Sequence, residues 1–212
     1  MHPLDVAIDS KTPGQAHLLL GTVSAQIDPS SWNDFEKFSA SQPELRDPLD
    51  HWGRLRTMAL IADRPIRAHF PDDQPVFPFI RHAIECFPSL SQSPLGMLVS
   101  TRFGLMFGIR AWLEGPTKEV TALADRLGWQ AAPHGSPCEE CTDQPCLSAC
   151  PVNAFSDTGY DYPGCRSELH RQASVGACWQ GGCLARRACP LSTAYTVSQA
   201  SFHHRAVLSG SS

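Results

Sequence analysis

The chain has 212 residues, a formal net charge of −4 at pH 7 and 18% charged residues. At roughly 150 residues per domain, this length predicts one large domain or two small ones. Hydrophobic residues make up 42% of the chain, close to the globular average, so the composition excludes wholesale disorder and a fibrous repeat. Because the chain has 21 acidic and 17 basic residues, we do not expect it to bind nucleic acid by bulk charge.

No stretch approaches the roughly 20 consecutive apolar residues that a membrane span requires. Residues 1–9 also lack a basic segment followed by an apolar one, the pattern of a secretory signal. We therefore expect a cytoplasmic protein without a membrane span. In a reducing cytosol, disulfides are a poor explanation for cysteines.

Residues 1–137 are predicted to form an α/β domain of unknown role. Apolar runs and periodicity predict four elements in its first part. These are a buried strand at 18–23, a capped helix at 31–38 and two further helices at 48–63 and 78–87.

Two apolar strands follow, at 95–100 and 103–112, and we expect a turn at Thr101-Arg102 to join them as a hairpin. An amphipathic helix at 117–127 should end at Gly128. Pro, Gly and Ser then interrupt any regular element at 131–137, which predicts a domain boundary.

The cysteines are concentrated beyond this boundary. Cys86 stands alone, whereas the other eight lie between Cys138 and Cys189. The first half of this region has the spacing C-x2-C-x4-C-x3-C-P. It comprises Cys138, Cys141, Cys146 and Cys150, followed by Pro151. The second half comprises Cys165, Cys178, Cys183 and Cys189, followed by Pro190.

A cysteine before proline has a known role in two-cluster ferredoxins, where it ligates the other cluster. Applied to this chain, that rule predicts two [4Fe–4S] clusters and uses all eight cysteines. The ligands of the first would be Cys138, Cys141, Cys146 and Cys189. The ligands of the second would be Cys165, Cys178, Cys183 and Cys150.

Three alternatives stay open at this point. Structural zinc also uses C-x2-C pairs, although only Cys138 and Cys141 have that form here. A disulfide scaffold would need an oxidising compartment. The spacings of the second half depart from the compact ferredoxin run, so a single cluster with idle remaining cysteines is the third alternative.

The first half, with Pro145-Cys146 and Cys150-Pro151, resembles the ligand loops of bacterial dicluster ferredoxins. Residues 93–99 and 102–105, placed ahead of the cysteines, also resemble a segment of the epoxyqueuosine reductase group. In that group an iron–sulfur domain passes electrons to a corrinoid on the preceding domain. The N-terminal part is short for a complete corrinoid domain, and the terminal helical repeats of many such reductases are absent. The resemblance is therefore closest to a small ferredoxin-like protein.

Several cations lie beside the cysteines in the sequence, namely Arg166, Arg171, Arg186 and Arg187. They could tune a cluster potential or dock a partner, or they could be solvated surface residues. For His203 and His204 we favour packing or surface positions over catalysis. The resemblance to ferredoxin-like proteins implies that residues 182–190 and 199–204 belong to the iron–sulfur module and its packing.

Other residues that could carry chemistry are expected to be structural. Cys86 is predicted to be a buried, inert small hydrophobe. Trp52, Trp112 and Trp129 lie on apolar faces, so we expect core positions rather than a cofactor pocket. No G-x-G-x-x-G or P-loop motif supports nucleotide binding.

Together these features predict an α+β protein in which residues 138–212 form a dicluster ferredoxin-like domain. Its function would be electron transfer with one or more redox partner proteins. No catalytic residue is identified. The alternatives are a corrinoid-linked reductase, with the corrinoid in the N-terminal domain, and a zinc-stabilised interaction module.

Overall fold

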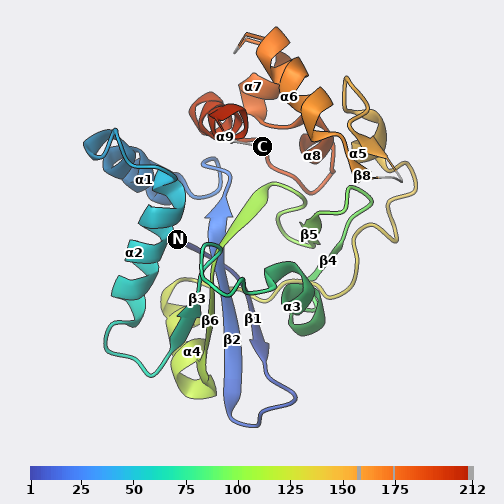
Figure 1. The fold of residues 1–212 in the computed structure, drawn as a ribbon. Helices are drawn as coiled ribbons and strands as arrows, with labels where there is room; N and C mark the ends of the chain where they lie inside the picture. Colours follow the sequence, from blue (N-terminus) through green and yellow to red (C-terminus); the bar gives the residue numbers. More distant parts are fainter. Residues whose placement is uncertain (157–158, 174, 210–212) are drawn as a thin grey trace. The chain divides into compact units, whose positions relative to one another are not determined.

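The computed structural model describes residues 1–156, 159–173 and 175–209 (Figure 1). The chain divides into two compact units. Unit 1 comprises Met1–Val23, Ser30–Ser89 and Phe107–His134, and unit 2 comprises Ser24–Pro29, Leu90–Met106 and Gly135–Ser212. Unit 2 thus contains two segments that the predicted division into 1–137 and 138–212 assigns to the N-terminal domain.

Unit 1 contains a four-stranded sheet with the strand order β1-β2-β6-β3. Its strands are β1 (His2–Ile8), β2 (Gln15–Val23), β6 (Phe107–Pro116) and β3 (Arg67–His69). Every pairing is antiparallel. The fold class is therefore mixed α+β as predicted for the whole chain, but the α/β description of the N-terminal part is wrong, because antiparallel strands need no helical crossovers between them.

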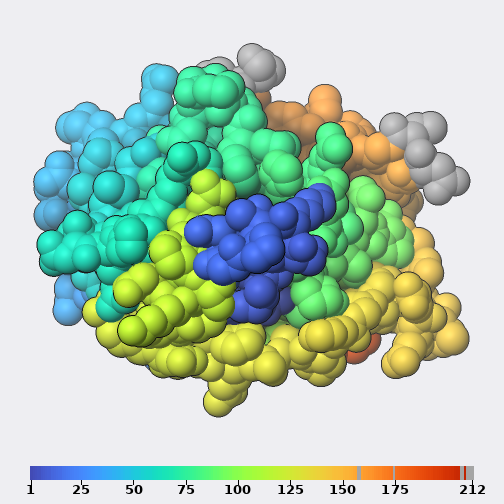
Figure 2. Space-filling view, turned by 90° about the horizontal axis from the view of Figure 1, so that it is seen from below, coloured from blue at the N-terminus to red at the C-terminus, as the bar shows by residue number. Residues whose placement is uncertain are grey.

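The core of unit 1 lies between this sheet and α4 (Thr117–Arg126). Leu18 and Leu20 of β2 point to the same face because side chains alternate along a strand, and they pair with Leu113 and Ala111 of β6. The β1–β2 turn lies beside the start of α4, where the Thr117 amide donates to the Gly14 carbonyl at 2.9 Å; Figure 2 shows this face with the turn in blue and the α4 region in yellow-green. The strand predicted at 18–23 and the helix at 117–127 are confirmed.

The other helices predicted for unit 1 are also present. They are α1 (Pro29–Ser41), α2 (Pro48–Ile61) and α3 (Phe79–Cys86). The sequence of α2 has apolar residues close to helical spacing, among them Leu55, yet Leu55 is 51% exposed. The buried row of α2 includes Gly53 and Thr57, which hydropathy does not mark. In the described ranges, no helix combines the length and the apolar character needed to cross a membrane.

The three tryptophans behave as expected of core residues. Trp52 and Trp112 are buried, and Trp129 packs half-buried against the core of unit 1. Trp112 also contacts the Phe87 ring, with centroids 5.0 Å apart.

The predicted hairpin across Thr101-Arg102 is wrong. Strand β5 (Leu98–Ser100) pairs with β4 (Leu90–Gln92), whereas β6 pairs with β2 and β3. Ser100 and Gly104 exchange two backbone hydrogen bonds of 2.9 and 3.0 Å, and Gly104 adopts a φ of 57°. This tight turn ends β5, and Gly104 supplies the left-handed conformation at little steric cost.

Unit 2 consists of short elements. Besides the β4–β5 pair it contains β7 (Phe155–Ser156), β8 (Gly159–Tyr160), α5 (Pro145–Ser148), α6 (Tyr162–Arg171), α7 (Ala177–Gly181), α8 (Leu184–Arg187) and α9 (Val197–Ser209). Segment 24–29 is bound to its C-terminal part, because the Ala25 amide donates to Oε1 of the buried Gln199 at 2.8 Å. A ferredoxin-like architecture of this unit stays a prediction.

A buried carboxylate interrupts the alternation of β1. The register of β1 shifts between Pro3 and Asp5, and both Leu4 and Asp5 are buried. Such a bulge turns consecutive side chains toward the interior. The Asp5 carboxylate accepts hydrogen bonds from the Val6 amide and from the Ser89 hydroxyl, so it is satisfied without a cation.

We predict that Ser89→Ala lowers the free energy of unfolding by about 1–3 kcal/mol, because it removes a donor to a buried carboxylate. The matched control is Ser41→Ala, whose exposed hydroxyl bonds only to Phe38 of its own helix; that change should stay within about 0.5 kcal/mol. Urea denaturation followed by tryptophan fluorescence measures both. Equal effects of the two substitutions would contradict the assigned role of Asp5.

Candidate functional site

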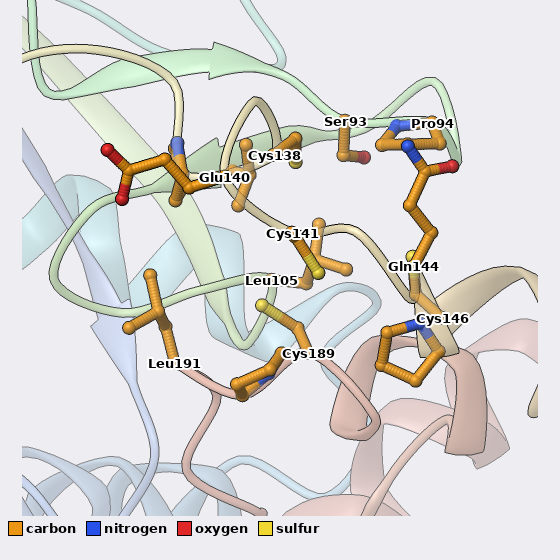
Figure 3. A pocket seen from close by; sticks show the side chains of 14 residues that line it. Ser93, Pro94, Leu105, Cys138, Glu140, Cys141, Gln144, Cys146, Cys189 and Leu191 are labelled. Carbon is orange, nitrogen blue, oxygen red and sulfur yellow. The ribbon is translucent and has the colours of Figure 1, made fainter.

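Four cysteines line one cavity of about 290 Å³ in unit 2, which we call the first cysteine site. They are Cys138, Cys141, Cys146 and Cys189. Figure 3 shows the sulfur atoms of Cys141 and Cys189 directed into the cavity, with the Glu140 carboxylate at its edge. Leu105 and Val99 contribute apolar walls.

Local structure explains how this site is assembled. Cys138 and Cys141 lie in a loop closed by a hydrogen bond from the Cys141 amide to the Cys138 carbonyl. Gln144 turns the chain with a φ of 38°, and Pro145 then begins α5, where its missing N–H is no disadvantage. Cys146 is therefore carried by the first turn of α5, and Cys189 arrives from the end of α8.

The other four clustered cysteines line a second cavity of unit 2, of about 30 Å³, which we call the second cysteine site. They are Cys150, Cys165, Cys178 and Cys183. Cys150 and Cys178 are buried, each with 9% exposure. This site is thus much tighter than the first.

Three short helices and a loop position the second site. Cys165 lies in α6, whose first turn is capped by Asp161 accepting from the Gly164 amide at 2.9 Å. Cys178 lies in α7, and Cys183 immediately precedes α8. Cys150 follows α5, and the Ala154 amide donates to its Sγ at 3.3 Å.

Two one-turn helices connect the sites. Helix α5 carries Cys146 of the first site and ends before Cys150 of the second, and α8 lies between Cys183 of the second and Cys189 of the first. The two helices pack against each other. At a rise of about 1.5 Å per residue, each spans only one turn between the sites.

The thiols of each site influence one another. Burial raises the pKa of Cys138 and Cys146, and the neighbouring Cys189 raises both further. Burial likewise raises the pKa of Cys165 and Cys178, with an added contribution from other thiols of the second site. Protonated thiols are thus favoured when no metal cation is bound, and metal binding would have to release their protons.

The structure groups the eight cysteines into the same two sets of four that the crossover rule predicts. All nine cysteines of the chain are free. Among the described residues, no group of three or more His, Cys, Asp or Glu side chains has an arrangement for a single metal ion. Cluster ligation stays a prediction.

The arginines near the cysteines have structural partners. Arg166 donates to the Leu208 carbonyl at 2.8 Å, and Arg186 donates to the Leu105 carbonyl at 2.7 Å. Arg171, with a 74% exposed side chain, pairs with Glu168. Arg166 and Arg186 are therefore not simply solvated surface residues.

Sequence reasoning missed three side chains at the second site. Glu168 and the buried His204 line its cavity. The Tyr160 side chain is hydrogen-bonded to Cys165. Nothing in the spacing of the cysteines marks these residues, because His204 comes from α9 and Tyr160 from β8.

Cys86 lies in unit 1, away from both sites in the chain. It is half-buried rather than fully buried, which corrects the expectation from sequence. Because α3 is a surface helix with only Ala83 fully buried, the thiol reaches the edge of the core. Burial raises the pKa of Cys86, so the thiolate form is disfavoured, and the low reactivity of this thiol stays a prediction.

Comparisons with protein-family models, with curated proteins and with solved structures found no match to this chain. The resemblances to dicluster ferredoxins and to epoxyqueuosine reductase therefore rest on the sequence motifs alone.

We predict that Gly182→Ala damages the second site, because Gly182 lies between Cys178 and Cys183 with a φ of 93° and an added Cβ would lie 2.8 Å from the Met106 methyl carbon. Backbone strain of about 1–2 kcal/mol and overpacking of about 1–3 kcal/mol should both reduce stability. Gly96→Ala is the matched control, since Gly96 also has a positive φ but open space around it. Thermal unfolding should separate the two, and equal losses would contradict the crowding at Gly182.

Proposed function

We propose that this chain is an iron–sulfur electron-transfer protein that holds one [4Fe–4S] cluster at each cysteine site. The observation that carries the proposal is the grouping of eight cysteines into two sets of four, each around its own cavity. Cys138, Cys141, Cys146 and Cys189 would hold the first cluster, and Cys150, Cys165, Cys178 and Cys183 the second. When bound, the clusters would supply one-electron chemistry.

The donor chemistry of both sites suits such clusters. Each site offers four free thiols, and thiolates are the ligands that hold [4Fe–4S] clusters in proteins. The remaining lining of the first cavity is largely apolar, including Val99, Leu105 and Leu191. An apolar surround excludes water and shields the cluster sulfurs.

The size of the first cavity favours a cluster over zinc. Four cysteines close around a single zinc ion with Zn–S distances of about 2.3 Å. A cavity of about 290 Å³ exceeds what one ion requires. At the first site, zinc therefore ranks behind a cluster; the second cavity, of about 30 Å³, gives no such argument, and its assignment rests on its four cysteines.

The shared helices α5 and α8 support electron transfer between the two sites. Each helix has one end at each site, so the clusters would be held as close neighbours within unit 2. Cys141 and Cys189 of the first site are half-exposed, which provides a path toward a redox partner at the surface. A corrinoid bound to the N-terminal part and a corrinoid-linked reductase activity stay predictions from the sequence.

Metal and sulfide analysis of anaerobically purified protein tests the proposal directly. We expect about eight irons and eight sulfides per chain, because two [4Fe–4S] clusters contain that number. About four irons would remove the second-site assignment. A colourless protein with stoichiometric zinc would overturn the proposed function.

Single substitutions test how the ligands are divided. Cys189→Ser should damage the cluster at Cys138, Cys141 and Cys146, and Cys150→Ser should damage the other, because Cys189 lines the first cavity and Cys150 the second. In EPR spectra of the reduced proteins, the two substitutions should change two different cluster signals. Cys86→Ser is the matched control and should retain the full iron content. Loss of the same signal in both site variants would contradict the crossover.

A further inference from the structure

His204 has an unexplained buried atom at the second cysteine site. It lies in α9 with 8% exposure, lines the cavity with the four cysteines, and its Nδ1 has no hydrogen-bond partner. The ring packs on Trp179, with centroids 5.4 Å apart. Leaving a buried polar atom without a partner is unfavourable, so its position at a cavity calls for a partner there.

The charge state of His204 is fixed by its surroundings. Burial, with a smaller contribution from the charge of Arg186, lowers its pKa to about 4. The imidazole is therefore neutral near pH 7 and carries one N–H, whose position follows from the hydrogen bond that it can make. A sulfur atom in the cavity would be an acceptor for that N–H.

Tyr160 gives the same site a second donor. Its hydroxyl is hydrogen-bonded to Cys165. A cysteine that ligates a cluster is a thiolate without a proton, so Tyr160 would be the donor and the sulfur the acceptor. The ring is fixed by stacking on Phe155, with centroids 4.9 Å apart and an interplanar angle of 17°.

The one carboxylate that lines this cavity is neutralised by its own partners. Glu168 accepts from Arg171 at 2.6 and 2.7 Å and from Gln172 at 3.0 Å. These bonds lower the pKa of Glu168 and keep it ionised beside a cation. The net charge of the pair is zero, so His204 is left as the uncharged polar side chain of the cavity lining, and Tyr160 reaches the site through its contact with Cys165.

We propose that Tyr160 and His204 set the reduction potential of the second cluster, Tyr160 by donating to the Cys165 sulfur and His204 by donating from its unpartnered Nδ1 to a sulfur of the cluster. This inference rests on the proposed function. Hydrogen bonds to cluster sulfurs stabilise the reduced form, which carries one more negative charge, and so raise the potential. Both are positioning residues and not ligands.

The test is a potentiometric titration of the purified holoprotein, with dithionite as the one-electron donor and EPR as the readout. Tyr160→Phe and His204→Phe should each shift the potential of the second cluster to a lower value and leave the first unchanged. His204→Gln, which keeps an N–H donor, should restore part of the shift. The signals are assigned to the sites with Cys189→Ser and Cys150→Ser.

Matched controls separate donation from packing. Tyr162→Phe removes the hydroxyl of a ring that touches Tyr160 edge-on, and His203→Phe alters the histidine that stacks on Tyr195. Both should leave the two potentials unchanged. If Tyr160→Phe and His204→Phe retain about eight irons per chain and the reduction potentials are unaltered, this inference is overturned while the proposed function stays intact. Absence of iron from the wild-type protein would instead overturn the proposed function.

A measurement on the wild-type chain covers the case in which His204→Phe does not fold. Protein labelled with ¹⁵N-histidine should show a ¹⁵N coupling to the reduced second cluster in electron–nuclear double resonance. Among the described residues, His204 is the only histidine that lines either cysteine cavity. No coupling would overturn the assignment to His204.

Discussion

The organisation of unit 2 depends on two one-turn helices that each join both cysteine sites. Because α5 begins near Cys146 and ends near Cys150, a shift of this helix moves one cysteine of each site together. Helix α8 imposes the same constraint on Cys183 and Cys189. The two helices pack on each other, so neither site can be rearranged independently of the other.

This constraint also explains why cysteines form part of the core of unit 2. Cys146 and Cys150 are buried with Leu105, Val99 and Ala185 in one hydrophobic cluster. Helices α5, α7 and α8 of this unit have only four or five residues and little apolar surface to bury, and small domains commonly need metals or disulfides for stability. The same cysteine side chains would therefore hold the proposed clusters and contribute to the stability of unit 2.

Local patterns in the sequence were sufficient where neighbouring residues decide the outcome. Helix α4 follows from its apolar periodicity and from Gly128, and the two cysteine sets follow from spacing and from the prolines after Cys150 and Cys189. The β4–β5 hairpin is local too, but the tight turn at Gly104 that separates β5 from β6 leaves no periodic signal. Other features depend on distant residues. The burial of Asp5 depends on Ser89, the position of His204 depends on how α9 packs in unit 2, and neither contact leaves a periodic signal in the chain.

The bond between Ala25 and Gln199 joins residues 174 positions apart, and it bears on the order of events during synthesis. Segment 24–29 leaves the ribosome long before Gln199. This contact of unit 2 can form only after the residues between them have been synthesised, and the loop that it closes is long. All eight clustered cysteines precede Gln199, so they emerge before this contact can close.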